Sequence, residues 1–313
     1  MILSLVIVPA QATDDDGYSV KFNSAATVTI DVSAETKTAT ATATAPNNVT
    51  PSDYAWSSSN TSVATVRKGD NGSATVTAVA KGEATITCTF TVPKAASAQP
   101  ANGDSTSQTE TKTASATITV TDNQGDLRNA ITGITYNTRT CTISGTSLTY
   151  YKYENDTDSW TVSLKDDSGF SNATATLNDG KLSVKAKKTS DNSDVTAIYN
   201  ATNGVSLSIK SSISNATATS ETVRKGGDLT LTAQISGVSN ASYEWLLASS
   251  AAPGTNDRAT YTVTVNTDNA ETLSLTCKVY SGSGNDKVLA ATKAFTVTVS
   301  DTEYILDVTP NTS

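Results

Sequence analysis

The three cysteine thiols are candidate nucleophiles in this 313-residue chain, which contains no histidine that could activate them. Catalysis by a Ser-His-Asp or Cys-His arrangement needs an imidazole, as do many zinc sites. Cys88, Cys141 and Cys277 are odd in number and far apart, so neither a thiolate metal cluster nor a disulfide framework is expected. We therefore expect three free thiols, no metal and no cofactor.

Carboxylates gather at residues 14–16, 154–158 and 166–167. Such oxygens could bind calcium at the junctions between modules, and a carboxylate pair could hydrolyse glycosides. None of these clusters has the D-x-D-x-D-G spacing of a calcium loop, and adjacent aspartates point in different directions. We interpret the clusters as solvated turns and expect a protein that is not an enzyme.

Aromatic side chains are a third kind of candidate, for binding rather than catalysis. The stretch TYYKYENDTDSW holds Tyr150, Tyr151, Tyr153 and Trp160 among polar residues. Each ring offers a large apolar face, and tyrosine adds a polar tip, which suits contact with a sugar or a protein. The favoured alternative is a cross-strand aromatic ladder that seals a small core. Both interpretations stay open at this point.

The elements that must position these side chains are β-strands. Apolar and polar residues alternate in ATVTIDVS from Ala26, SATVTAVA from Ser73, EATITCTFTV from Glu83, ASATITVTD from Ala114, TLSLTCKVY from Thr272 and AFTVTVSD from Ala294. Threonine and valine at alternate positions suit a half-buried pleated surface. No convincing helical stripe exceeds two turns, so the pattern predicts an all-β fold.

A weak internal repeat divides the chain. Cys88 follows Trp56 by 32 residues, and Cys277 follows Trp245 by the same interval, although the intervening sequences differ. Equal spacing predicts two copies of one sandwich plan, with these four residues in the cores. A segment of similar strand spacing lies between the two copies.

The predicted organisation is three tandem β-sandwich domains in an elongated arrangement, at residues 1–121, 122–212 and 213–301, followed by a tail at 302–313. ILSLVIVPA is interpreted as the first strand rather than as a signal peptide, because it lacks a positive n-region. Residues 93–113 are rich in Ala, Ser, Thr, Pro and Gln and are predicted to form a long exposed loop.

The runs WSSSNTSVATV from Trp56 and VTAVAKGEATIT from Val76 resemble the bacterial immunoglobulin-like (Ig-like) group 2 domain. The resemblance covers roughly residues 1–121 and is interrupted at 93–113. The third domain resembles Ig-like domains generically, and the middle one resembles them mainly by strand spacing. Such domains occur in bacterial surface adhesins and tailed-phage virion proteins. The resemblance therefore implies scaffold and adhesion roles and brings no catalytic residues.

The resemblance also gives the cysteines an interpretation. In disulfide-bearing Ig domains a tryptophan packs on a bridge between strands B and F. Here Cys88 and Cys277 take the F position, whereas apolar residues are expected on the B strands, namely Val28 and Ile30 in the first domain and Leu229 and Leu231 in the third. A lone buried cysteine behaves as a small hydrophobe, so such cores can form in a reducing cytoplasm.

The charge balance limits the expected partners. The formal net charge is −8, and no Lys/Arg cluster exceeds two or three residues. Nucleic acid would require a basic stripe for its phosphates. No apolar run reaches the ~18 residues of a membrane span. We expect neither nucleic acid nor a membrane as a partner.

These observations favour a non-enzymatic structural or decoration protein on the exterior of a tailed-phage virion, made in the host cytoplasm. Its partners would be a major capsid or tail protein, and host-surface or mucus glycans. A chain that starts at Met1 in its first strand and lacks disulfides fits release by lysis. The alternative is a bacterial cell-surface adhesin, or a secreted Ig-like or carbohydrate-binding module.

Overall fold

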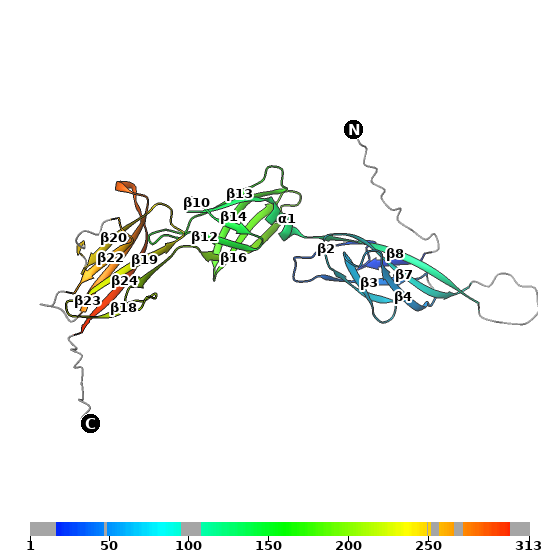
Figure 1. The fold of residues 1–313 in the computed structure, drawn as a ribbon. Helices are drawn as coiled ribbons and strands as arrows, with labels where there is room; N and C mark the ends of the chain where they lie inside the picture. The colour runs from blue at the N-terminus through cyan, green and yellow to red at the C-terminus, as the bar shows by residue number, and fades with distance from the viewer. Residues whose placement is uncertain are drawn as a thin grey trace, which may run out of the picture. The chain divides into compact units, whose positions relative to one another are not determined.

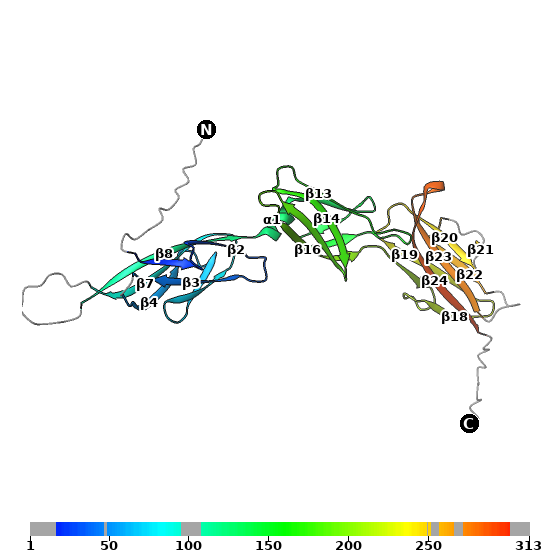
Figure 2. The same ribbon diagram turned by 180° about the vertical axis from the view of Figure 1, so that it is seen from behind.

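The computed structural model describes residues 17–46, 49–94, 108–248, 250–251, 257–265 and 272–300. Within these ranges the chain is built of β-strands, and α1 (Asn123–Ala130) is the one α-helix (Figure 1 and Figure 2). The all-β prediction is confirmed. The chain divides into two compact units, unit 1 at residues 1–129 and unit 2 at residues 130–313.

Unit 1 contains two four-stranded sheets. The first has the order β1–β3–β6–β5, formed by β1 (Ser19–Phe22), β3 (Thr38–Thr44), β6 (Ser73–Ala78) and β5 (Ala64–Lys68). The second has the order β2–β8–β7–β4, formed by β2 (Thr27–Asp31), β8 (Thr109–Thr121), β7 (Gly82–Pro93) and β4 (Ser52–Ser58). β2 runs parallel to β8. Strands A, B, E and D thus face strands A′, G, F and C, which is the predicted Ig-like plan.

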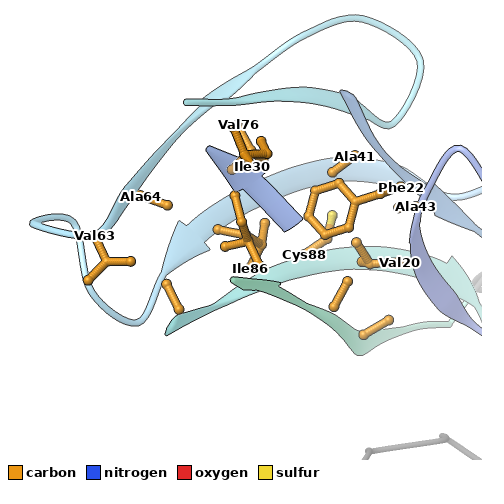
Figure 3. Packing of buried hydrophobic residues seen from close by; sticks show 14 of the residues in the cluster. Val20, Phe22, Ile30, Ala41, Ala43, Val63, Ala64, Val76, Ile86 and Cys88 are labelled. Carbon is orange, nitrogen blue, oxygen red and sulfur yellow. The ribbon is translucent and has the colours of Figure 1, made fainter. Parts of the chain in front are cut away.

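The core of unit 1 lies between these sheets. Figure 3 shows side chains from both sheets directed into this space. Buried members include Val20, Phe22, Ala41, Val76, Ile86, Cys88 and Ile118. Along β7 the inward residues alternate with threonines, as the period of a pleated strand requires.

The strand that faces Cys88 across the core is β3, which differs from the prediction. Val28 and Ile30 lie on β2, in the same sheet as Cys88. The inward residues of β3 include Ala41 and Ala43, both buried. Alanine carries little hydrophobic signal, so TATATAT was a weaker strand-B candidate than TVTID. The prediction of Val28 and Ile30 as strand-B residues is wrong.

β7 and β8 form a long antiparallel pair. Their register runs from Gly82 opposite Val120 to Pro93 opposite Thr109, and the Lys94 N–H donates to the Gln108 carbonyl at 2.8 Å. Residues 109–113 are therefore strand, which corrects the end of the predicted 93–113 loop. The ladder with β7 holds them extended despite their polar composition. Residues 95–107, ILSLVIVPA and the tail at 302–313 lie outside the described residues.

α1 follows β8 directly, where the sequence indicated only a short polar junction. Asp122 caps the helix, since its Oδ1 accepts a hydrogen bond from the Gly125 N–H at 2.8 Å. Asp126 pairs with Lys81 at 2.6 Å, and the helix's first N–H donates to Asp31 Oδ1 at 3.3 Å. These contacts tie α1 to the preceding sandwich, and unit 1 extends to residue 129.

In unit 2, the strands after residue 205 repeat the plan of unit 1. One sheet has the order β17–β19–β22, formed by β17 (Ser206–Ser211), β19 (Asp228–Ser236) and β22 (Thr260–Thr264). The other has the order β18–β24–β23–β20–β21, formed by β18 (Ser220–Arg224), β24 (Val288–Ser300), β23 (Thr272–Ser281), β20 (Ala241–Leu247) and β21 (Ser250–Ala251). A short 3-10 turn, η1 (Gly284–Asp286), precedes β24. β18 runs parallel to β24, and Leu229 and Leu231 are buried on β19, at the B position.

The strands between residues 131 and 203 have a different order. A three-stranded sheet, β10–β9–β13, is formed by β10 (Arg139–Thr140), β9 (Ile131–Tyr136) and β13 (Trp160–Leu164). A five-stranded sheet, β11–β12–β16–β15–β14, is formed by β11 (Thr142–Ser144), β12 (Ser147–Tyr150), β16 (Asp194–Asn203), β15 (Lys181–Lys188) and β14 (Phe170–Asn178). The structure separates two units, so the division into three sandwich domains stays a prediction.

Candidate functional site

The two Trp–Cys pairs take the same position in their sheets. Trp56 on β4 is the cross-strand partner of Cys88 on β7, and Trp245 on β20 is the cross-strand partner of Cys277 on β23. Equal spacing in the sequence thus becomes equal register. Both cysteines and Trp245 are fully buried, whereas Trp56 packs against the core of unit 1 and stays half-buried. All four residues serve packing.

The three thiols are free and buried. Burial raises the pKa of Cys88 to about 11, of Cys141 to about 11 and of Cys277 to about 12. A thiol acts as a nucleophile or metal ligand through its thiolate form, which is scarce at neutral pH when the pKa is this high. These cysteines are therefore unsuited to catalysis.

The predicted aromatic surface divides into two groups, and the first is a packed cluster. Tyr150 and Trp160 contact Tyr136 on β9, with ring centroids 5.3 Å and 4.8 Å from that of Tyr136. Their own centroids are 5.4 Å apart. Trp160 is also the cross-strand partner of Tyr136. Such edge-on and tilted contacts stabilise aromatic clusters. Tyr150 and Trp160 thus form an aromatic ladder, the alternative favoured by the sequence.

A hydrogen-bonded carboxylate fixes this cluster. The Tyr136 hydroxyl donates to Asp158 Oδ1 at 2.7 Å, and Lys152 Nζ donates to the same oxygen at 2.8 Å. Burial, together with the bond to Asp158, raises the pKa of Tyr136 to about 12. Lys152 and Tyr136 hold the pKa of Asp158 below its usual range. Asp158, from the acidic stretch 154–158, is therefore an anchor for the cluster.

Tyr151 and Tyr153 form the second group, arranged around Arg139. The Arg139 guanidinium carbon lies 4.0 Å from the centroid of the Tyr153 ring, and its Nε donates to the Tyr151 carbonyl at 2.7 Å. Arg139 also forms an ion pair with Asp156, and Asp156 Oδ2 accepts the Tyr153 N–H at 2.7 Å. A charge stacked on a ring and paired in this way holds the 151–156 segment in one conformation.

This segment forms one side of a pocket in unit 2, with a volume of about 680 Å³. Tyr151, Tyr153, Arg139 and Thr140 line that side. The other side consists of Gly237, Val238, Ser239, Ser281 and Val288. We call this site the Tyr151 pocket. Its volume lies within the range of small-molecule sites, and its walls combine aromatic, aliphatic and hydroxyl groups, so it is suited to binding.

Sequence reasoning found two of the residues that line this pocket and missed the others. Tyr151 and Tyr153 stood out as aromatic residues among polar ones. Arg139 follows a turn and carries no motif, and the residues near 238, 281 and 288 come from separate strands and turns. Only the fold brings them together. Val288 is half exposed at the start of β24, and this exposure of an apolar side chain becomes visible only in the structure.

Where the structure describes the acidic stretches, they do not form a calcium-binding loop. Asp156 forms an ion pair with Arg139, and Asp158 forms one with Lys152. Residues 14–16 lie outside the described ranges. Within those ranges, no group of three or more cysteine, aspartate or glutamate side chains is placed to hold a metal ion. The described part of the chain also contains no helix with the length and apolarity that a membrane crossing requires.

Comparison with protein families bears on the sandwich of unit 1. Residues 19–99 match the family model of the bacterial Ig-like domain (group 2). The match spans β1 to β7, including the Trp56–Cys88 pair, and confirms the resemblance drawn from the sequence. No curated protein sequence matches the chain.

Solved structures of Ig-like and fibronectin-like arrays resemble the chain over most of its length. The fibronectin(III)-like modules of Clostridium thermocellum CbhA are 10% identical, with 90% of this chain and 94% of theirs covered, at a TM-score of 0.23. The four N-terminal Ig domains of Dscam1 isoform 6.9 are 11% identical, with 91% and 73% covered, at a TM-score of 0.23. Similarity at these scores carries no argument about function.

Proposed function

We propose that this chain is a non-enzymatic display protein that presents Ig-like modules on the exterior of a tailed-phage virion and makes weak contacts with the host surface. The observation that carries the adhesive part is the Tyr151 pocket, which aromatic and hydroxyl groups line. Contacts of this kind are weak singly, but many copies on one particle act together. The docking partner would be a major capsid or tail protein.

The cysteines support an origin in a reducing cytoplasm. Cys88 and Cys277 occupy the F-strand position at which Ig domains of oxidising compartments carry a disulfide, yet both are free. Their cores rest on buried aliphatic and aromatic side chains instead. Such a protein would fold in the host cell and leave it by lysis.

A bacterial cell-surface adhesin is the second candidate, favoured by the match of residues 19–99 to a bacterial Ig-like domain. Quantitative mass spectrometry separates the two. The virion proposal expects many copies in each purified particle, retained through density-gradient centrifugation. Recovery of the protein with envelopes of phage-free cells, and its absence from particles, would establish the adhesin instead.

A further inference from the structure

We infer that the Tyr151 pocket binds a neutral saccharide, with the Tyr151 ring as its stacking surface. This inference rests on the proposed adhesive function and names the ligand class of its site. Tyr151 comes from the connection between β12 and β13. The opposite wall comes from the turn after β19 and from the adjoining ends of β23 and β24.

The first wall of the pocket is held rigid from behind. The Arg139 guanidinium stacks on Tyr153, pairs with Asp156 and binds the Tyr151 carbonyl. The Tyr151 hydroxyl lies 3.3 Å from Thr142 Oγ1. A binding wall that is already ordered loses little entropy when a ligand arrives, which favours even small ligands.

Close backbone contacts fix the opposite wall relative to the first. Gly237 has a φ of +71°, and a Cβ at this position would lie 2.5 Å from the Gly204 carbonyl oxygen. Ser236 Oγ donates to that same oxygen at 3.1 Å. Gly204 in turn donates its N–H to the Tyr150 carbonyl at 2.8 Å, next to Tyr151. The turn that carries Val238 and the segment that carries Tyr151 are therefore joined through Gly204.

The chemistry of the walls indicates a ligand with both an apolar face and many hydroxyls. Tyr151 and Val288 offer apolar surface, while Thr140, Ser239 and Ser281 bring hydroxyls that both donate and accept. A pyranose ring has this dual character, with C–H groups on its face and hydroxyls on its rim. Ser281 Oγ already donates to the Ser239 carbonyl at 3.2 Å, and a ligand with hydroxyls of its own could pair with the remaining capacity of these groups, which a purely apolar ligand could not do.

The charges around the pocket indicate that the saccharide is neutral. Arg139 is the one cationic residue that lines it, and its guanidinium is already paired with Asp156. It therefore offers little attraction to a carboxylate or sulfate on the ligand. Beside the same wall, Lys287 Nζ lies 4.1 Å from the centroid of the Tyr280 ring, and the negative charges of Glu244 and Glu154 act on the same tyrosine, so the charges of both signs there offset each other.

The test uses the full chain on an array of neutral, sialylated and sulfated oligosaccharides, presented multivalently. The neutral oligosaccharide with the highest signal is then titrated against the chain by NMR. We expect a neutral oligosaccharide to bind, and Tyr151→Ala to lower its affinity about tenfold or more through loss of the stacking face. Tyr151→Phe, which keeps the ring, should retain most of the affinity.

A matched pair of surface variants controls for fold and charge. Val288→Lys places a charge in the pocket and should lower the affinity. Ile198→Lys makes a similar change at a residue 40% exposed on β16, which does not line the pocket, and should leave the affinity unchanged. Thermal unfolding should show all variants folded.

Three results would overturn the inference: no neutral oligosaccharide binds, acidic glycans alone bind, or Tyr151→Ala and Val288→Lys leave the affinity unaltered. The particle measurement is independent of this test. Many copies per virion without saccharide binding would retain the display function and remove only the ligand. Saccharide binding by a protein that is absent from virions would retain the ligand and remove the virion display function.

Discussion

The two Trp–Cys pairs share one register but differ in what surrounds them. Trp245 is fully buried, stacks near Tyr261 at 5.8 Å between centroids, and donates its indole N–H to the Arg258 carbonyl at 3.2 Å. Trp56 is half-buried, and its buried Nε1 has no hydrogen-bond partner among the described residues.

The strands at the B position also differ, because the one in the 206–300 sandwich brings larger side chains to the core. β19 brings Leu229 and Leu231 to the core of the 206–300 sandwich, while β3 of unit 1 brings Ala41 and Ala43. Unit 1 compensates with Phe22, Phe90 and Ile86 from other strands. The comparison teaches that register is set by strand pairing alone, and that each sandwich then fills the space around the pair with different side chains.

The largest expected effect comes from truncating the tryptophans. Trp245→Ala should destabilise its sandwich by about 3–5 kcal/mol, because a fully buried aromatic side chain leaves a cavity. Trp56→Ala should cost less, since part of its surface stays in water. Hydrogen exchange read on peptides from β23 and β7 would measure the two losses separately. Equal losses would remove the difference between the pairs.

The next effect concerns the facing strands. Leu231→Ala should cost about 2–5 kcal/mol through its cavity, whereas Ala41→Gly should cost only about 1 kcal/mol through lost backbone restriction and packing. Denaturant unfolding followed by exchange on β19 and β3 measures both. A larger loss for Ala41→Gly would mean that β3 contributes more to its core than its alanines indicate.

Alkaline pH should weaken unit 2 more than unit 1. Each folded thiol has a pKa of about 11 or 12, above its ordinary value of 9.0, so between pH 9 and 11 the unfolded chain loses a proton that the folded chain keeps. The contribution of each thiol to the free energy of unfolding is therefore intact below pH 9 and decreases above it by about 1.4 kcal/mol for each pH unit. Unit 2 holds Cys141 and Cys277, and unit 1 holds Cys88.

Thermal unfolding between pH 8 and 10 checks this expectation, with Cys277→Ala and Cys88→Ala as matched variants. Cys88→Ala should flatten the pH dependence of unit 1, and Cys277→Ala should reduce that of unit 2, which keeps Cys141. Thiol labelling at pH 8 should find no reactive group in the native chain and three after denaturation. Detection of one thiol after denaturation would contradict the free state of the cysteines.

The smallest expected effect isolates the indole hydrogen bond. Trp245→Phe leaves the Arg258 carbonyl without its donor, whereas Trp56→Phe removes a donor that already lacks a partner. Beyond the lost volume, Trp245→Phe should cost about 1 kcal/mol more. Exchange on β20 and β4 would compare them. Equal costs would indicate that the Trp56 indole finds a partner in solution.

Local patterns in the sequence predicted much of the fold. The six alternating runs correspond to β2, β6, β7, β8, β23 and β24, and the Trp–Cys spacing predicted two copies of one plan, in which the structure gives both pairs the same register. Both signals depend on neighbouring residues or on one pairing. The assignment of β3 failed because its core residues are alanines. α1 was missed because NQGDLRNA has no apolar stripe, and its stability comes from the Asp122 cap and contacts with unit 1.

The candidate site could be predicted only in part, for a physical reason. Period-two alternation cannot separate Tyr150 and Trp160, which pack on Tyr136, from Tyr151 and Tyr153, whose segment Arg139 holds through the Tyr151 carbonyl and the Tyr153 ring. That division depends on where the strand β12 ends and the connection begins. The opposite wall of the pocket is contributed some 85 to 135 residues later in the chain, and no local pattern encodes such a contact.

The parallel pairing of β2 with β8, and of β18 with β24, has a mechanical consequence. In each sandwich an early strand lies beside the last one and points the same way, over five residue pairs. A pull that draws the two ends of the sandwich apart slides these strands along each other, so their hydrogen bonds bear the load together. In an antiparallel pair loaded from one end, the bonds would break one after another. A display protein of the kind proposed above would be exposed to drag, and in both sandwiches a parallel pair between an early strand and the last one would oppose that tension.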